Sequence, residues 1–90
     1  MEVVRCMLVG VSYHSPHLPP TPDDPIWLVR EPHRCDPHAV QVWTRVDGAW
    51  AQLGYVDRAT AASLASRELV TARLITAGNG HSIPMAVQVK

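Results

Sequence analysis

One short run of the sequence holds most of the side chains that could do chemistry. It is the polar stretch of residues 30–38, Arg-Glu-Pro-His-Arg-Cys-Asp-Pro-His. The Asp36 carboxylate can accept a short hydrogen bond from a hydroxyl group, and Arg30 and Arg34 can pair with phosphates. The alternative for Asp36 is local, because an aspartate ahead of Pro37 can close a turn on its own backbone. The residues alone therefore predict either a charged binding loop or a self-contained turn.

The same run contains residue types that suit a zinc site or a cysteine nucleophile. His33, Cys35, Asp36 and His38 could ligate zinc. However, the sequence has no Cys-x-x-Cys pair, and two prolines restrict the loop, so we expect no metal and no cofactor. Cys35 beside His33 suggests nucleophilic chemistry. No oxyanion device, Walker loop or His-Glu-x-x-His motif accompanies them, so we expect a protein that is not an enzyme.

The elements that must position this loop are mostly strands. Val-rich and alternating segments bounded by turn residues predict about six strands, and an Ala-rich segment predicts one helix. The predicted strands are Val3–Tyr13, Ile26–Arg30, Ala39–Val46, Trp50–Val56, Leu69–Ala77 and Ile83–Val89, and the predicted helix is Arg58–Arg67. The Pro-rich residues 15–25 predict an irregular surface loop. Ninety residues allow one domain, so residues 1–90 are expected to form a single small, partly open β-barrel.

Local signals refine these elements. Asp47-Gly48 predicts a tight hairpin, because both residues tolerate a positive φ. Asp57 fits the N-cap of the helix. Gly10 in the first strand indicates a bulge or a close backbone approach, and Pro84 indicates an edge position in the last strand. The helix is expected to bury an apolar face of Ala61, Leu64 and Ala65.

Three tryptophans carry most of the aromatic bulk, since the chain has no Phe. Trp27 lies between Ile26 and Leu28 and is expected in the core or at its rim. Trp43 and Trp50 flank the hairpin and are expected to pair across it. If exposed, the three rings would instead form a base-stacking platform or mark a protein contact patch.

The bulk properties narrow the class of protein. The formal net charge is zero, with eight basic and eight acidic residues, which argues against a generic nucleic-acid coat but leaves room for a local basic cluster. Cys6 and Cys35 do not make a secreted disulfide framework. The N-terminal run resembles a strand more than a signal peptide, and no apolar stretch approaches the roughly 20 residues that span a bilayer. We therefore expect a reduced, cytoplasmic protein with no membrane partner.

Two motifs together resemble the HIRAN domain family. The first comprises Arg30-Glu31-Pro32, Asp36 and Ala39-Val40, and the second is Leu53-Gly54-Tyr55-Val56 leading into the Ala-rich helix. The chain departs from the family pattern in three ways. The loop is one residue short between Pro32 and Asp36, Cys35 replaces an aromatic residue, and His38 replaces an asparagine. The resemblance covers nearly the whole chain and implies a mainly β, OB-like barrel with its helix between the fourth and fifth strands.

The resemblance also implies a function. HIRAN domains are associated with single-stranded DNA ends, so it implies a non-enzymatic module that captures single-stranded DNA, preferably at a free 3′-hydroxyl end, in DNA repair or replication-fork processing. The chain carries no motor, so a helicase or nuclease partner would be a separate protein. Asp36 would bind the terminal hydroxyl, Tyr13 would stack on a base, and Arg34, Tyr55 and Arg58 would contact the backbone. The full expected set of DNA-binding residues is Tyr13, His14, Arg30, His33, Arg34, Asp36, His38, Tyr55 and Arg58.

A second class of function stays open. Three features favour a protein-interaction or scaffold domain of the same fold that has weakened or lost DNA binding. They are the zero net charge, the missing loop aromatic at Cys35, and Ser12 where the family has a basic residue.

Overall fold

The computed structural model describes residues 1–10, 20–77 and 82–90. Within them the chain forms strands and one helix in the predicted order, with the helix after the fourth strand. The elements are β1 (Glu2–Val9), β2 (Trp27–Arg30), β3 (Val40–Val46), β4 (Ala49–Val56), α2 (Arg58–Ser63), β5 (Leu69–Leu74) and β6 (Ser82–Val89). The first predicted strand is thus confirmed as far as Val9, and its predicted end at Tyr13 lies outside the described residues.

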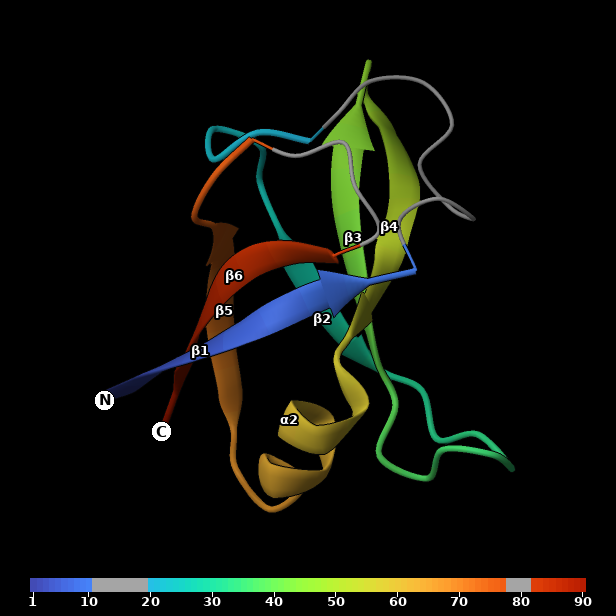
Figure 1. The fold of residues 1–90 in the computed structure, drawn as a ribbon. Helices are drawn as coiled ribbons and strands as arrows, with labels where there is room; N and C mark the ends of the chain where they lie inside the picture. The colour runs from blue at the N-terminus through green and yellow to red at the C-terminus, as the bar shows by residue number, and fades with distance from the viewer. Residues whose placement is uncertain (11–19, 78–81) are drawn as a thin grey trace.

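The strands form one antiparallel sheet that curls into a nearly closed barrel. Their order is β2-β3-β4-β1-β6-β5, so β2 and β5 are the two edges. Figure 1 shows the sheet bending until these edges approach one another. A single bridge between Ile26 and Ala72 joins them. The predicted class, a mainly β, partly open barrel, is confirmed.

The β3–β4 hairpin turns at Asp47-Gly48 as predicted. The φ angles of these residues are 51° and 81°, the positive values that a tight two-residue hairpin needs. The turn sets the register, with Val46 opposite Ala49 and Arg45 opposite Trp50. The predicted pairing of Trp43 with Trp50 is therefore wrong, because counting back from a two-residue turn places Trp43 opposite Gln52.

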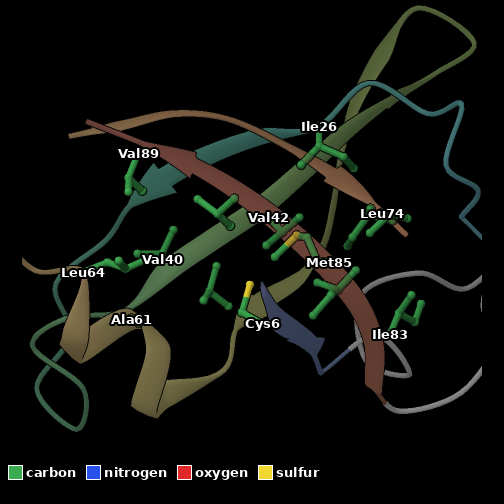
Figure 2. Packing of buried hydrophobic residues seen from close by; sticks show 14 residues of the cluster. Cys6, Ile26, Val40, Val42, Ala61, Leu64, Leu74, Ile83, Met85 and Val89 are labelled. Atoms are coloured by element: carbon green, nitrogen blue, oxygen red, sulfur yellow. The ribbon is translucent and has the colours of Figure 1, made fainter. Parts of the chain in front are cut away.

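Alternating residues of the strands fill the barrel. Along β3, Val40, Val42 and Thr44 are buried, whereas the side chains between them face outward. The largest fully buried side chains come from β1, β3, β5 and β6: Leu8, Val40, Val42, Leu74, Ile83, Met85, Val87 and Val89. Figure 2 shows them meeting in the interior, together with Ala61 and Leu64 from the helical segment. Side chains from strands that are far apart in the sequence thus make up the core.

Gly54 allows β1 and β4 to cross closely. A Cβ atom at this position would lie 2.2 Å from the carbonyl oxygen of Val9, which no side chain can tolerate. Gly10, at the end of β1, has a φ of 76°, and a Cβ there would lie 3.6 Å from the Tyr55 ring. Gly10 thus follows β1 in a positive-φ conformation beside the Tyr55 ring, and the contact is with a side chain rather than the predicted close approach of another backbone segment.

Helix α2 begins where predicted but ends early. Asp57 is the N-cap, and its side chain accepts a hydrogen bond from the Thr60 amide. The helix ends at Ser63 rather than at Arg67, and Ala65 of the predicted apolar face is exposed while Ala61 and Leu64 are buried. No helix among the described residues has the length and apolar character that crossing a membrane demands.

An arginine from β2 binds the carbonyl groups that follow the helix. The Arg30 guanidinium donates hydrogen bonds to the carbonyl oxygens of Leu64, at 2.9 Å, and of Arg67, at 2.5 Å. Carbonyls at a helix end lack intrahelical partners, so an arginine from a neighbouring strand can satisfy them. Arg30 thereby stabilises the turn that leads into β5.

The predicted edge position of Pro84 is wrong, because β6 lies between β1 and β5. Pro84 lies opposite Met7 of the neighbouring strand β1. The Met7 amide donates a hydrogen bond of 2.9 Å to the Asp57 carboxylate and not to Pro84. On its other side the Pro84 carbonyl accepts from Ile75, which follows the last residue of β5. The missing N–H of the proline thus falls where the β5 ladder ends, so a proline is tolerated inside the sheet.

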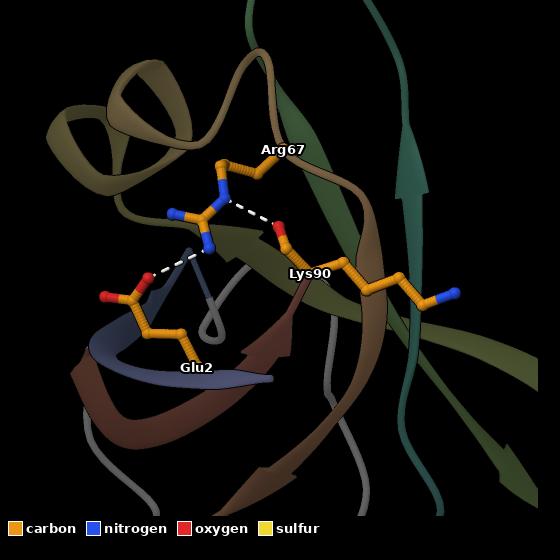
Figure 3. A network of polar contacts seen from close by, with 3 residues as sticks. All are labelled: Glu2, Arg67 and Lys90. Carbon is orange, nitrogen blue, oxygen red and sulfur yellow. Dashed lines mark hydrogen bonds and ion pairs between the residues drawn. The ribbon is translucent and has the colours of Figure 1, made fainter.

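A polar network links the two ends of the chain to the connection between α2 and β5. Arg67 donates from Nε to the Lys90 carbonyl at 2.6 Å and pairs with the Glu2 carboxylate at 2.9 Å (Figure 3). Lys90 also donates from its amide to the Glu68 carbonyl. These contacts hold the β1 and β6 ends next to the start of β5.

Candidate nucleic-acid interface

The segment between β2 and β3 forms a small hairpin of its own. His33 and Asp36 exchange two backbone hydrogen bonds of 3.0 Å. The Ala39 amide donates to the Asp36 carbonyl, and the Glu31 amide donates to the Ala39 carbonyl. Because these bonds satisfy the backbone locally, the polar loop has a defined shape rather than that of an open coil.

Asp36 occupies the centre of this loop. Its Oδ1 atom accepts a hydrogen bond of 3.2 Å from the His38 amide, so the local turn considered from the sequence is present. An ionised carboxylate has about four acceptor positions. The single bond described for Asp36 therefore leaves it capacity to accept from a ligand hydroxyl.

A cavity of about 370 Å³ lies beside this loop. It is lined by Glu31, His33, Asp36, Ala39, Gln41 and Tyr55. Gln41 and Tyr55 face one another across β3 and β4, so two sheet residues form one wall and the loop forms the other. The fold thus brings Asp36 and Tyr55, predicted separately, to the same cavity.

The remaining predicted residues have different positions. Arg34 and His38 belong to the loop and are exposed, and His33 lines the cavity. The Arg58 guanidinium donates to the Cys35 carbonyl, so the start of α2 holds the tip of the loop. Tyr13 and His14 lie outside the described residues, as does Ser12.

Arg30 has a structural position. Its guanidinium binds the carbonyls that follow α2, and its side chain is not among those that line the cavity. We therefore leave Arg30 out of the set of residues proposed to contact DNA.

Three cavity residues, Glu31, Ala39 and Gln41, are not among the residues that the sequence predicts to bind DNA. Glu31 and Ala39 belong to the family motif, and Gln41 does not. The signal for Gln41 was present in the alternation of β3, which places Gln41, Trp43 and Arg45 on one face. Glu31 and Asp36 together give the cavity two carboxylates, which disfavour an anion inside it.

The described residues give no support to a metal or nucleophile site in the loop. Across residues 1–10, 20–77 and 82–90, no three His, Cys, Asp or Glu side chains converge as metal ligands would. Nδ1 of His33 accepts a hydrogen bond from the Cys35 amide at 3.1 Å, so this nitrogen serves the backbone rather than the thiol.

Cys6 and Asp57, whose pKa values depart from their ordinary values, lie in a different part of the barrel. Burial, and secondarily the Asp57 carboxylate, raise the pKa of Cys6 to about 11. Burial also works to raise the pKa of Asp57, but hydrogen bonds from the Met7 amide and from the hydroxyl and amide of Thr60 outweigh it and lower that pKa. Both groups line a second cavity of about 400 Å³.

Comparison with known proteins agrees with the motifs and the geometry. A family model described as HIRAN domain matches residues 1–81 of the 90-residue chain. No curated protein and no solved structure matched the chain. HIRAN domains are binding modules, known as a family of DNA-binding domains. With a match over most of its length, the chain belongs to the HIRAN domain family.

Proposed function

We propose that this protein captures the free 3′-hydroxyl end of single-stranded DNA in the cavity between the β2–β3 loop and β4. The observation that carries the proposal is the meeting of Asp36 and Tyr55 in one open cavity of about 370 Å³. The size suits a terminal nucleoside rather than a duplex. Membership in a family of DNA-binding domains supports the choice of ligand.

The charge of the cavity favours a hydroxyl end over a phosphate end. A 3′-hydroxyl donates a hydrogen bond to the Asp36 carboxylate, and a charge-assisted bond of this kind is stronger than a neutral one. A 3′-phosphate would meet both Asp36 and Glu31, and like charges at such a distance repel. The proposal therefore requires discrimination between the two ends.

Cations around the cavity would hold the phosphates that precede the terminal nucleotide. Arg34 is exposed on the loop, and Arg58 contacts the loop tip from the start of α2; the exposed His38 offers ring nitrogens for hydrogen bonds beside them. A guanidinium has five N–H donors, so Arg58 can bind the Cys35 carbonyl and a phosphate together. Few phosphates are engaged, so we expect a shallow dependence of affinity on salt concentration.

The test is fluorescence anisotropy with a 5′-labelled single strand that ends in either a 3′-hydroxyl or a 3′-phosphate. We expect the hydroxyl end to bind about tenfold more tightly, the value of one charged hydrogen bond. In Asp36→Asn the amide oxygen can still accept from His38, so the turn survives while the discrimination falls toward unity. Asp23→Asn, which makes the same change in net charge at an exposed site, should retain the preference.

Equal, millimolar binding of both ends by the unaltered protein would contradict the proposal. An undiminished preference in Asp36→Asn would remove Asp36 from the role. The first result would favour the second candidate, a protein-interaction domain of HIRAN fold. The exposed Cys35 at the loop tip is the specific observation in its favour, because a thiol cannot stack on a base.

An end-capturing module would act in DNA repair or replication-fork processing, next to a helicase or nuclease carried by another protein. The proposed compartment is the cytoplasm, where both thiols stay reduced.

A further inference from the structure

The outer face of β2, β3 and β4 carries a continuous band of rings and polar groups. The register places Val29, Gln41 and Tyr55 in one row across the three strands, and Trp27, Trp43 and Gln52 in the next. Arg45 and Trp50 form the row nearest the hairpin. We call the set Trp27, Trp43, Arg45 and Trp50 the tryptophan stripe.

Two rings of the stripe, from the strands on either side of β3, contact one another. Trp27 and Trp50 contact edge to face, with centroids 4.2 Å apart and planes at 82°. Arg45 lies over the Trp50 ring at 5.5 Å and donates to the Gly48 carbonyl. Trp27 is 42% exposed and Trp50 is 49% exposed. The stripe thus presents aromatic surface and one cation to solvent.

The stripe is continuous with the cavity. Gln41 lines the cavity and accepts a hydrogen bond of 2.8 Å from the Trp43 indole N–H. Alternate residues of a strand lie about 6.6 Å apart, so the path along β3 from Gln41 to Arg45 is roughly 13 Å long. Figure 1 shows the two ends of this path, with the loop that borders the cavity at one end of β3 and the hairpin at the other.

We propose that the tryptophan stripe binds the nucleotides upstream of the captured 3′ end. This inference rests on the proposed function, which fixes the terminal nucleotide in the cavity. The strand would then run along β3 toward the hairpin, with bases on the exposed rings of Trp27 and Trp50 and a phosphate near Arg45. Aromatic rings with an adjacent arginine bind single strands without sequence preference, since every base has a flat face.

Chemistry on the stripe favours a nucleic acid over a protein. Gln41, Gln52 and Arg45 alternate with the rings, so the band offers hydrogen bonds and charge along its whole length. A protein docking site of this size would be expected to have an apolar centre with its polar groups at the rim. The stripe also leads directly into a cavity whose size suits the end of a single strand, which again favours a nucleic acid over a protein.

The experiment compares a dinucleotide with an octanucleotide, both of thymidine and both ending in a 3′-hydroxyl. In the unaltered protein the longer strand should bind about tenfold more tightly, and it should quench tryptophan fluorescence, whereas the dinucleotide should leave the fluorescence nearly unchanged. Trp27→Ala and Trp50→Ala should lose the gain from length and keep the affinity for the dinucleotide. Trp50→Phe should retain most of the gain, and Val3→Ala, an exposed apolar change on β1, should change neither.

The outcomes separate this inference from the proposed function. If both strands bind equally and fluorescence does not respond, the stripe is not the path and end capture still stands. If neither strand binds, end capture fails and the stripe proposal fails with it. A dimer in solution that Trp27→Ala or Trp50→Ala dissociates would overturn the inference in favour of a second copy of the chain.

Discussion

Asp36 has a structural role, the closing of a local turn, and a proposed binding role, and the sequence presented the two as alternatives. Its carboxylate closes the loop through the His38 amide and also lines the cavity. A turn residue that is already ordered loses little further entropy when a ligand binds, which favours affinity. The local turn therefore supports the binding role instead of replacing it.

The two cysteines are expected to differ sharply in reactivity. Burial raises the pKa of Cys6 to about 11, and only its thiolate would attack a disulfide reagent. Cys35 is exposed at the loop tip. An aromatic disulfide reagent should therefore modify one thiol quickly in the folded protein and the second only after denaturant is added. Rapid modification of both, or of Cys6 in Cys35→Ser, would contradict the buried position of Cys6.

Several residue roles were beyond prediction from the sequence. Arg30 is next to the loop in sequence, yet its guanidinium binds carbonyls of Leu64 and Arg67, and such a long-range contact leaves no local signal. Gln41 shares a face with Trp43, but only the loop's hairpin makes it part of a cavity. Asp36 and Tyr55 do line one cavity, since their motifs flank strands whose order could be predicted, and their role in binding DNA stays a prediction.

At the scale of elements, Asp57 joins β1, β4 and α2. It follows the last residue of β4, caps α2 through Thr60, accepts from the Met7 amide of β1, and donates its own amide to the Met7 carbonyl. The sequence predicted the cap because an aspartate before an Ala-rich segment is a local signal. The contact with β1 spans fifty residues and was not predictable.

Asp57→Ala should destabilise the fold by about 2–3 kcal/mol, since it removes a cap and leaves the partly buried Met7 amide without a partner. Urea unfolding followed by tryptophan fluorescence measures this change. Ser63→Ala, at the other end of α2, is the control and should cost less than about 1 kcal/mol. Equal losses in both variants would contradict the joining role of Asp57.

Asp57 should also contribute to the dependence of stability on pH. Its pKa in the fold lies below the ordinary value of 3.8, so the unfolded chain binds the proton more readily. The stabilisation is therefore fully present above about pH 4 and is lost as the pH falls through the lower, folded-state pKa. Asp57→Asn should reduce the stability lost between neutral pH and this acidic range. If Asp57→Asn lost as much stability at acidic pH as the unaltered protein does, the contribution of Asp57 to this pH dependence would be contradicted.

Over the whole molecule, closure of the barrel depends on non-local contacts. Residues 82–90 lie beyond the part that matches the family, yet β6 occupies the interior of the sheet and buries Ile83, Met85, Val87 and Val89. The number and order of strands could be predicted from alternation and turn residues. The position of β6 could not, because Pro84 indicated an edge, and only the end of the β5 ladder beside Pro84 shows why the proline is tolerated inside the sheet.

Gly54→Ala should be the most damaging small change in the barrel. The added carbon would lie 2.2 Å from the Val9 carbonyl, so β1 and β4 would have to separate. We expect a loss of about 3 kcal/mol or more in the free energy of unfolding. In Gly48→Ala the added carbon meets nothing within 4 Å, and only its positive φ is unfavourable, so the loss should be about 1 kcal/mol. Urea unfolding measures both losses. Equal losses of stability in the two variants would contradict the close crossing of β1 and β4 at Gly54.

The most direct test of end capture is a titration of the amide NMR spectrum with a dinucleotide that ends in a 3′-hydroxyl. The account predicts saturable shifts at Glu31, Asp36, Gln41 and Tyr55, with little change in β5 and β6, and much weaker shifts when the dinucleotide ends in a 3′-phosphate. Shifts centred elsewhere on the barrel, or equal responses to the two ends, would contradict it.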